Sequence, residues 1–110
     1  VQIAEKEKPL EKKTVKEIKI LAAAPRYSEN SPPSYPSIAR RRGYEGVVML
    51  SVKVLVDGNV GELRIKGTSG HSILDRAAVK AVKKWKFKPA FRGEVPVPMW
   101  VEVPVRFVIK

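Results

Sequence analysis

The chain of 110 residues lacks cysteine and has a single histidine, His71. Without cysteine it can form neither a disulfide nor a thiolate, so cysteine redox and nucleophile chemistry are excluded. A lone histidine in a Gly/Ser loop is more often a surface residue than a ligand, because metal sites need several ligands at defined spacing. The acidic residues are scattered, and no glycine-rich phosphate loop with its lysine follows a strand. We therefore expect no enzyme activity, no metal and no cofactor.

A membrane span and a signal peptide are also missing. No run of apolar residues approaches the roughly 18 that cross a bilayer, and residues 1–13 are charged rather than apolar. Since the sequence does not begin with Met, we expect a fragment of a longer chain, whose anchor or signal would precede it.

Negative charge is in short supply. Lysine and arginine number 22 against 11 aspartates and glutamates, which gives a net charge of +11. Residues 1–34 hold 7 basic and 5 acidic side chains, whereas residues 35–110 hold 15 and 6. Such a basic domain is attracted to nucleic acid, anionic lipid or acidic proteins, although a generally cationic surface explains the same composition. The clusters "ARRRG" and "KKWKFK" keep a nucleic-acid or anionic-surface binder open as an alternative.

The distribution of residues divides the chain into two parts. Residues 1–34 contain Glu, Lys and Pro, which favour an extended and solvated chain, and we interpret them as the end of a flexible linker. Within this part, residues 14–24 have apolar side chains at helical spacing, which leaves a short helix open. Residues 35–110 have the periodic apolar patterns of one folded domain.

Two helices are predicted in the domain. The first begins at Pro36, since proline suits the first helical position, and ends near Arg42 before Gly43. The second begins at Ser72, which forms a capping-box pattern with Asp75. The apolar stripe of this helix consists of Leu74, Ala78, Ala81 and Trp85. The tryptophan is therefore expected in the core rather than as a base-stacking platform, which counts against nucleic acid.

Three strands are predicted. Apolar residues occupy every even position from Val48 to Val56, "DGN" at 57–59 predicts a tight turn, and a shorter strand returns from Val60 to Lys66. Apolar residues then occupy every odd position from Val95 to Ile109. The order α-β-β-α-β predicts an α+β fold in two layers, with a three-stranded antiparallel sheet of order 2-1-3 and two helices on one face.

The last predicted strand carries Pro96, Pro98 and Pro104, which cannot donate a hydrogen bond to a neighbouring strand. Proline is tolerated at the edge of a sheet, where its missing N–H is directed outward. Pro104 therefore predicts an edge strand in which Glu102, Pro104 and Arg106 direct their backbone polar groups to the free edge. Such an edge is either guarded against aggregation or accepts a partner strand by β-augmentation, and the two roles are compatible.

Residues 34–110 resemble the TonB C-terminal domain family. The matching pieces are Tyr35-Pro36, Gly46-x-Val48, Asp57-Gly58, "SGHSILDRAAVKAVKKWKFKPA" at 69–90 and "VPVRF" at 103–107. The resemblance implies a non-catalytic energy transducer at the periplasmic side of the inner membrane. Its N-terminal membrane anchor would work with ExbB and ExbD. Its C-terminal domain would bind the "TonB box" of outer-membrane transporters for siderophores, cobalamin or metal chelates, as a strand added to the last strand.

The resemblance and the edge argument together indicate two groups of partner-binding residues. They are Pro32, Pro33, Ser34, Tyr35, Pro36, Arg40, Arg41, Arg42, and Met99, Trp100, Val101, Glu102, Val103, Pro104, Val105, Arg106, Phe107. The family arginine two residues after the Tyr-Pro proline is Ile38 here, and we hypothesise that one of the three following arginines replaces it. The same edge is also expected to allow a homodimer. A TolA-like envelope-integrity domain is the alternative of similar fold, and no nucleic acid is expected as a partner.

Overall fold

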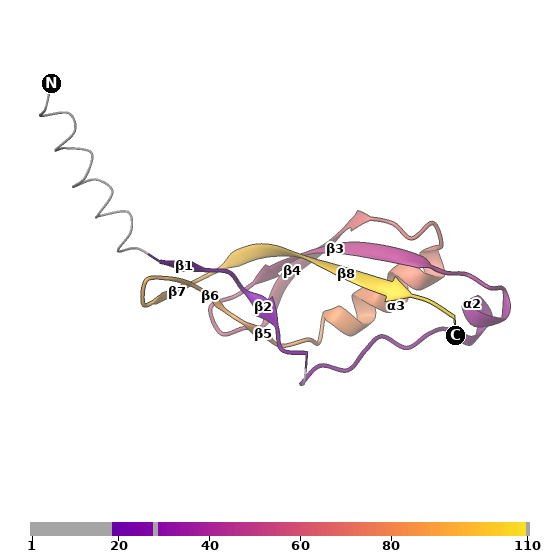
Figure 1. Ribbon diagram of the computed structural model, residues 1–110, viewed down its shortest axis with the longest axis horizontal. Helices are drawn as coiled ribbons and strands as arrows, with labels where there is room; N and C mark the ends of the chain where they lie inside the picture. Colours follow the sequence, from indigo (N-terminus) through magenta and orange to yellow (C-terminus); the bar gives the residue numbers. More distant parts are fainter. Residues whose placement is uncertain (1–18, 28, 110) are drawn as a thin grey trace, which may run out of the picture.

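The computed structural model describes residues 19–27 and 29–109 (Figure 1). Its elements are β1 (Ile20–Leu21), β2 (Ala24–Pro25), α2 (Ser37–Arg41), β3 (Gly46–Val54), β4 (Val60–Gly67), α3 (Ser72–Val82), β5 (Phe87–Lys88), β6 (Ala90–Arg92), β7 (Val95–Val97) and β8 (Met99–Phe107). The predicted α-β-β-α-β series corresponds to α2, β3, β4, α3 and β8. The short strands β1, β6 and β7 lie at the end of the domain away from α2 (Figure 1).

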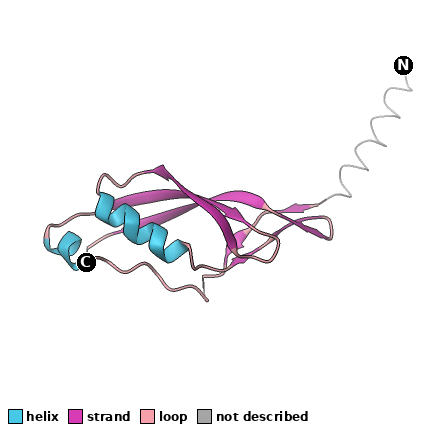
Figure 2. Cartoon of the chain, turned by 180° about the vertical axis from the view of Figure 1, so that it is seen from behind, coloured by secondary structure: helices cyan, strands magenta, loops and turns pink. Residues whose placement is uncertain are grey.

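β3 is the central strand of the main sheet, whose order β4-β3-β8 is antiparallel throughout. This order confirms the predicted 2-1-3 arrangement and the α+β fold. The even-numbered side chains of β3 have no exposed surface: Val48, Leu50, Val52 and Val54. α3 packs over this face of the sheet, against β3 and β4 (Figure 2). The alternating pattern of β3 therefore determines which face of the sheet forms the core.

The turn between β3 and β4 forms at the predicted "DGN" sequence. The Asp57 carboxylate accepts a hydrogen bond from the backbone N–H of Asn59 at 3.0 Å, and Gly58 adopts a positive φ of 88°. A side chain at Gly58 would also collide with the backbone carbonyl of Phe87. The turn thus requires glycine for both its conformation and its packing.

The last apolar run is divided into two strands rather than one. β7 ends at Val97 and pairs with β6, whereas β8 begins at Met99 and pairs with β3. Pro98 lies between them. The single strand expected from Val95 to Ile109 is therefore wrong at its start, because the chain changes partner at this proline.

The predicted capping box at the start of α3 is wrong. The N-cap is His71 and has no side-chain cap bond, while Asp75 turns back to the loop that precedes the helix. Its carboxylate accepts hydrogen bonds from the Thr68 hydroxyl, from the Ser69 N–H at 3.0 Å and from the Ser69 hydroxyl at 2.7 Å. Burial raises the pKa of Asp75, but these hydrogen bonds outweigh burial and lower the pKa overall. Asp75 thus fastens the loop to the helix rather than capping it.

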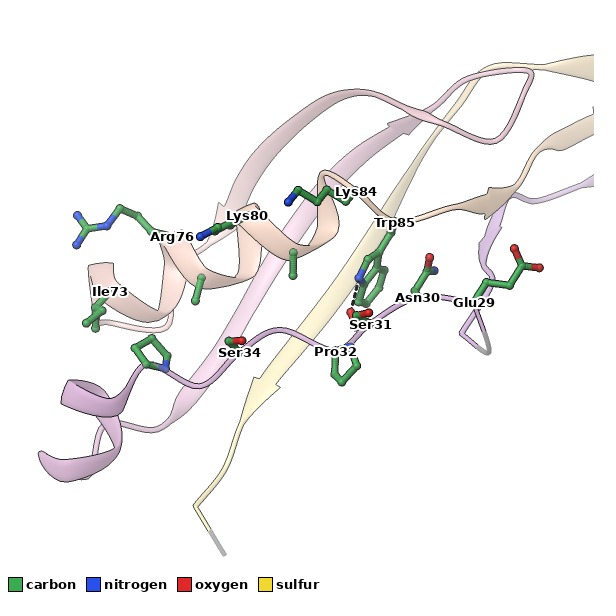
Figure 3. A pocket seen from close by; sticks show the side chains of 13 residues that line it. Glu29, Asn30, Ser31, Pro32, Ser34, Ile73, Arg76, Lys80, Lys84 and Trp85 are labelled. Atoms are coloured by element: carbon green, nitrogen blue, oxygen red, sulfur yellow. Dashed lines mark hydrogen bonds between the residues drawn. The ribbon is translucent and has the colours of Figure 1, made fainter.

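Trp85 lies beyond the end of α3, which stops at Val82, yet it belongs to the core as expected. Its side chain is only 8% exposed. The indole N–H donates to the backbone carbonyl of Ser31 at 2.8 Å (dashed line in Figure 3). This bond holds the segment before α2 against the carboxyl end of α3.

Residues 19–26 form an extended segment that pairs with residues 86–93. β1 pairs with β6 and β2 with β5 in one constant antiparallel register. Two further bonds fit the same register, from Gly93 N–H to Lys19 C=O at 2.6 Å and from Arg26 N–H to Lys86 C=O at 3.0 Å. The sequence left open whether residues 14–24 form a helix. Residues 19–24 are extended, and residues 14–18 lie outside the described residues.

The register also explains the gap between β1 and β2. Ala23 falls opposite Pro89, which has no N–H to donate. The bonded residues also change between the two strands, from odd-numbered Lys19 to even-numbered Arg26, so β1 and β2 form separate short ladders. Ala23 is nevertheless only 7% exposed and joins the core cluster. The boundary between linker and domain, expected after residue 34, stays a prediction. Residues 19–26 pair with residues 86–93 of the folded part.

The buried position of Ala23 gives a first prediction. Ala23→Asp should place a charge in the core and lower the free energy of unfolding by about 1–3 kcal/mol, with faster amide exchange at Gly93 and Arg26. Ala22→Asp, at the exposed neighbouring position, is the matched control and should change little. Chemical denaturation and hydrogen exchange measure both effects, and equal losses in the two variants would contradict the ladder.

Asp75 gives a prediction about pH. Because its folded pKa is lowered, the stabilisation is complete above the unfolded value of about 3.9 and is lost as pH falls through the folded pKa. Asp75→Asn should lower stability by roughly 1–3 kcal/mol at neutral pH and should flatten the loss of stability in acid. Urea unfolding at several pH values tests this, and an unchanged acid dependence would refute it.

Candidate functional site

Both outer strands of the main sheet have an edge without a partner strand in the described part of the chain, but the two edges differ. β4 has register shifts against β3 between Met49 and Leu50 and between Lys53 and Val54. Such irregularities increase the twist of a strand, and a twisted edge pairs poorly with an added strand. β8 keeps an uninterrupted register with β3 over nine pairs, from Gly46–Phe107 to Val54–Met99. The regular edge is therefore that of β8.

The hydrogen-bonding direction of β8 follows from the turn of the neighbouring hairpin. Leu55 N–H donates to Asn59 C=O at 2.8 Å, on the β4 side of β3. Alternate residues of a strand point their polar groups the same way, so the even residues of β3 face β8. Since Val48 lies opposite Val105, the odd residues of β8 face β3. The free edge then presents the even residues Trp100, Glu102, Pro104 and Arg106.

Pro104 agrees with this assignment. It lies opposite Met49, an odd residue of β3 whose polar groups face β4. The missing N–H of the proline therefore removes no hydrogen bond between β8 and β3. The free edge retains N–H donors at Trp100, Glu102 and Arg106, and each even residue supplies a carbonyl acceptor. An added strand therefore finds a regular row of donors and acceptors with one gap.

The side chains of the even residues form the exposed face of the sheet beside this edge. Trp100 is 41% exposed, and the Arg64 guanidinium lies 5.0 Å from its ring centroid. Glu102 makes an ion pair across β3 with Lys66. Sequence reasoning missed Arg64 and Lys66, although their outward positions in the hairpin could have indicated them. These contacts orient the two side chains most able to select a partner.

The first predicted group of site residues meets the second at the end of β8. The Tyr35 ring packs edge-on against Phe107, with 5.3 Å between ring centroids, and the Arg40 guanidinium lies 5.4 Å from the Tyr35 centroid. The Tyr35 hydroxyl donates to the backbone carbonyl of Tyr44. Desolvation and Glu45 raise the pKa of Tyr35, with Arg40 opposing. Tyr35 and Arg40 thus adjoin the end of the β8 edge.

The remaining predicted residues take several positions. In β8, Val103, Val105 and Phe107 are buried, and Met99 and Val101 are half-buried. The backbone polar groups of these odd-numbered residues face β3 and are not on the free edge. Arg41 and Arg42 are exposed at the end of α2. Pro32, Pro33, Ser34 and Pro36 belong to the segment that runs beside α3 (Figure 3). The structure therefore joins only part of the 32–42 group to β8.

Another contact near this site was not predicted. The backbone N–H of Ile109 donates to the Glu45 carboxylate at 2.7 Å, which ties the chain after β8 to the loop before β3. In residues 19–27 and 29–109, no group of three His, Asp or Glu side chains is placed to hold a metal ion. None of the described helices has the length and apolar character to span a bilayer.

The fold is that of a small α+β domain with one regular free strand edge. The chain matches the family described as Gram-negative bacterial TonB protein C-terminal over residues 31–109. It is 49% identical over 81 residues to "Protein tonB2" of Pseudomonas aeruginosa, covering 74% of this chain and 30% of that protein. It is 40% identical over 78 residues to "Protein TonB" of Vibrio cholerae, covering 71% and 32%.

Solved structures agree. The solution NMR structure of the Pseudomonas aeruginosa TonB C-terminal domain has a TM-score of 0.63 and 25% identity, with 86% of this chain and 88% of that chain covered. The Helicobacter pylori TonB C-terminal domain, residues 179–285, has a TM-score of 0.54 over 76% and 73%. The chain belongs to the TonB C-terminal domain family. It spans about a third of the length of these two curated relatives.

The gap at Pro104 gives a prediction about self-association. Pro104→Val should add a donor to the free edge and strengthen any pairing of two β8 strands, by about fivefold for each net hydrogen bond of roughly 1 kcal/mol. Pro98→Val, outside β8, is the control and should leave association unchanged. Sedimentation velocity over a concentration series measures both, and equal behaviour of the two variants would contradict the edge assignment.

Proposed function

We propose that this domain is the periplasmic end of a TonB-like energy transducer and binds the TonB box of outer-membrane transporters by strand addition to β8. The observation that carries the proposal is the regular free edge of β8, with three N–H donors at Trp100, Glu102 and Arg106. β-augmentation uses such backbone groups for affinity and neighbouring side chains for specificity. Family membership supports the choice of partner.

Side chains around the edge would select the incoming strand. Trp100 offers a half-exposed ring, and Glu102 and Arg106 offer charges of both signs. Tyr35 and Arg40, beside Phe107, extend the contact surface beyond the end of β8. We propose that Arg40 takes the role of the family arginine that is absent at Ile38, because its guanidinium lies over the Tyr35 ring, which packs against Phe107 of β8.

The function that follows is mechanical rather than chemical. The longer protein is anchored in the inner membrane and coupled to ExbB and ExbD, and force from the proton gradient reaches the domain through the N-terminal linker. The transporter plug, held by its TonB box on β8, is pulled, and siderophore, cobalamin or metal-chelate uptake follows. The ladder of residues 19–26 with 86–93 supports this path, because it attaches the entering chain close to the start of the β7–β8 segment.

The alternative functions have less support. Trp85, within the basic cluster "KKWKFK", is 8% exposed and bonded to Ser31, so it offers no face on which a base can stack. The matched family is TonB rather than TolA. Strand addition to β8 therefore accounts for more of the structure than nucleic-acid binding does.

Titration of the isotope-labelled chain with a TonB-box peptide tests the proposal. Amide shifts should concentrate at residues 97–108 and 32–42. Arg106→Pro removes one outward donor and should weaken binding by roughly fivefold or more, as expected for a lost hydrogen bond of about 1 kcal/mol. Arg106→Ala keeps the donor and is the matched control. Equal affinities of the two folded variants, or shifts confined elsewhere, would reject strand addition at this edge.

A further inference from the structure

A groove lies between α3 and the segment that precedes α2, away from the free edge of β8. Its volume is about 540 Å³, within the range of roughly 300–1,000 Å³ typical of ligand pockets. One wall is residues 29–36 and the other is the exposed side of α3 (Figure 3). We call it the α3 groove.

The floor of the α3 groove is apolar. It consists of Pro32, Pro36, Ile73, Ala77, Ala81 and Trp85. In Figure 3 Ile73 lies at the end of the groove nearest α2, and the Trp85 ring lies at the other end, beside Ser31 and Pro32. The small alanine side chains leave the space open, and the bond from Trp85 to Ser31 fixes the separation of the two walls there. The floor is thus suited to apolar side chains of a narrow ligand.

The rim along α3 is cationic. Arg76 and Lys80 are four residues apart on one side of α3, and Lys84, in the turn that follows the helix, lines the same groove. All three are exposed, and within residues 19–27 and 29–109 none of them has an ion-pair partner. Glu29, the acidic residue of the lining, is paired with Arg26 at 3.3 Å. The charge of this rim is therefore not balanced by the groove itself.

We propose that the α3 groove binds an extended segment of a partner protein in which acidic and apolar side chains alternate. The apolar side chains enter the floor and the carboxylates face the rim of Arg76, Lys80 and Lys84. No residue of β8 lines this surface, although its wall includes Pro32, Ser34 and Pro36 of the group proposed to contact the transporter.

The shape of the groove favours a peptide over other anionic partners. A bilayer is flat and would contact the exposed rim without filling the floor between α3 and residues 29–36. Single-stranded nucleic acid is typically bound by stacking of its bases on aromatic rings, and the aromatic residue here, Trp85, is 8% exposed and bonded to Ser31. An extended peptide matches a narrow trough with an apolar floor and charge along one wall.

The test uses a short peptide that alternates valine and glutamate, with a valine–glutamine peptide as the uncharged control. We expect the acidic peptide to shift the amides of residues 73–85 and the Trp85 indole N–H, with weaker binding at higher salt. The double variant Lys80→Glu/Lys84→Glu should weaken binding by roughly tenfold. Lys88→Glu/Arg92→Glu makes the same change in net charge at exposed positions of β5 and β6 and should weaken it much less.

A second variant tests the floor independently of charge. Ala81→Phe fills the groove from the α3 side and should weaken the acidic peptide while circular dichroism stays unchanged. Arg106→Pro, at the β8 edge, should leave binding to the groove intact, which separates this proposal from strand addition. Equal loss in the two charge variants, shifts confined to residues 99–107, or tighter binding to vesicles containing anionic phosphatidylglycerol than to the peptide would overturn it.

Discussion

The pairing of β3 on both of its edges is the constraint on which the rest of the domain depends. Its even side chains, Val48 to Val54, are fully buried, so the face that meets α3 is fixed. Its two neighbours must then be outer strands, and they differ in regularity. β4 absorbs two register shifts, whereas β8 runs without one from Met99 to Phe107. A regular free edge thus arises on β8 because the irregularities of the hairpin are confined to the other side of β3.

The period-two patterns of apolar residues predicted most of the main sheet. Alternation predicted the inner faces of β3 and β8. Pro104 predicted the edge position, because a residue without an N–H cannot donate to strands on both sides. These are local properties of the sequence, so they can be predicted without knowledge of distant contacts. The cross-strand contacts of Arg64 with Trp100 and of Lys66 with Glu102 depend on the register of two ladders, which sequence alone did not specify.

The wrong capping box and the helix left open for residues 14–24 yielded to the same kind of competitor. Ser72 and Asp75 have capping-box spacing, but the carboxylate has better donors in Thr68 and Ser69, which the loop brings within reach. Residues 19–24 have helical spacing of apolar side chains, but residues 86–93 offer them an unpaired edge in a continuous register. In each case a tertiary partner outcompeted a local motif, because propensities worth about 1 kcal/mol yield to several hydrogen bonds. At Ala23, opposite Pro89, the segment is held by burial in the core instead of by a hydrogen bond.

The two surfaces proposed for binding rely on different physics, and the structure keeps them apart. The β8 edge would recognise the backbone of a partner strand and would therefore tolerate different sequences, with Trp100, Glu102 and Arg106 selecting among side chains. The α3 groove has no free strand edge and recognises side chains, through an apolar floor and an unbalanced cationic rim. Residues 31–36 connect them, since Ser31 is bonded to Trp85 and Tyr35 packs on Phe107. A ligand that displaces this segment from α3 would disturb the end of β8, so occupancy of the groove would be physically linked to the strand proposed to bind the transporter.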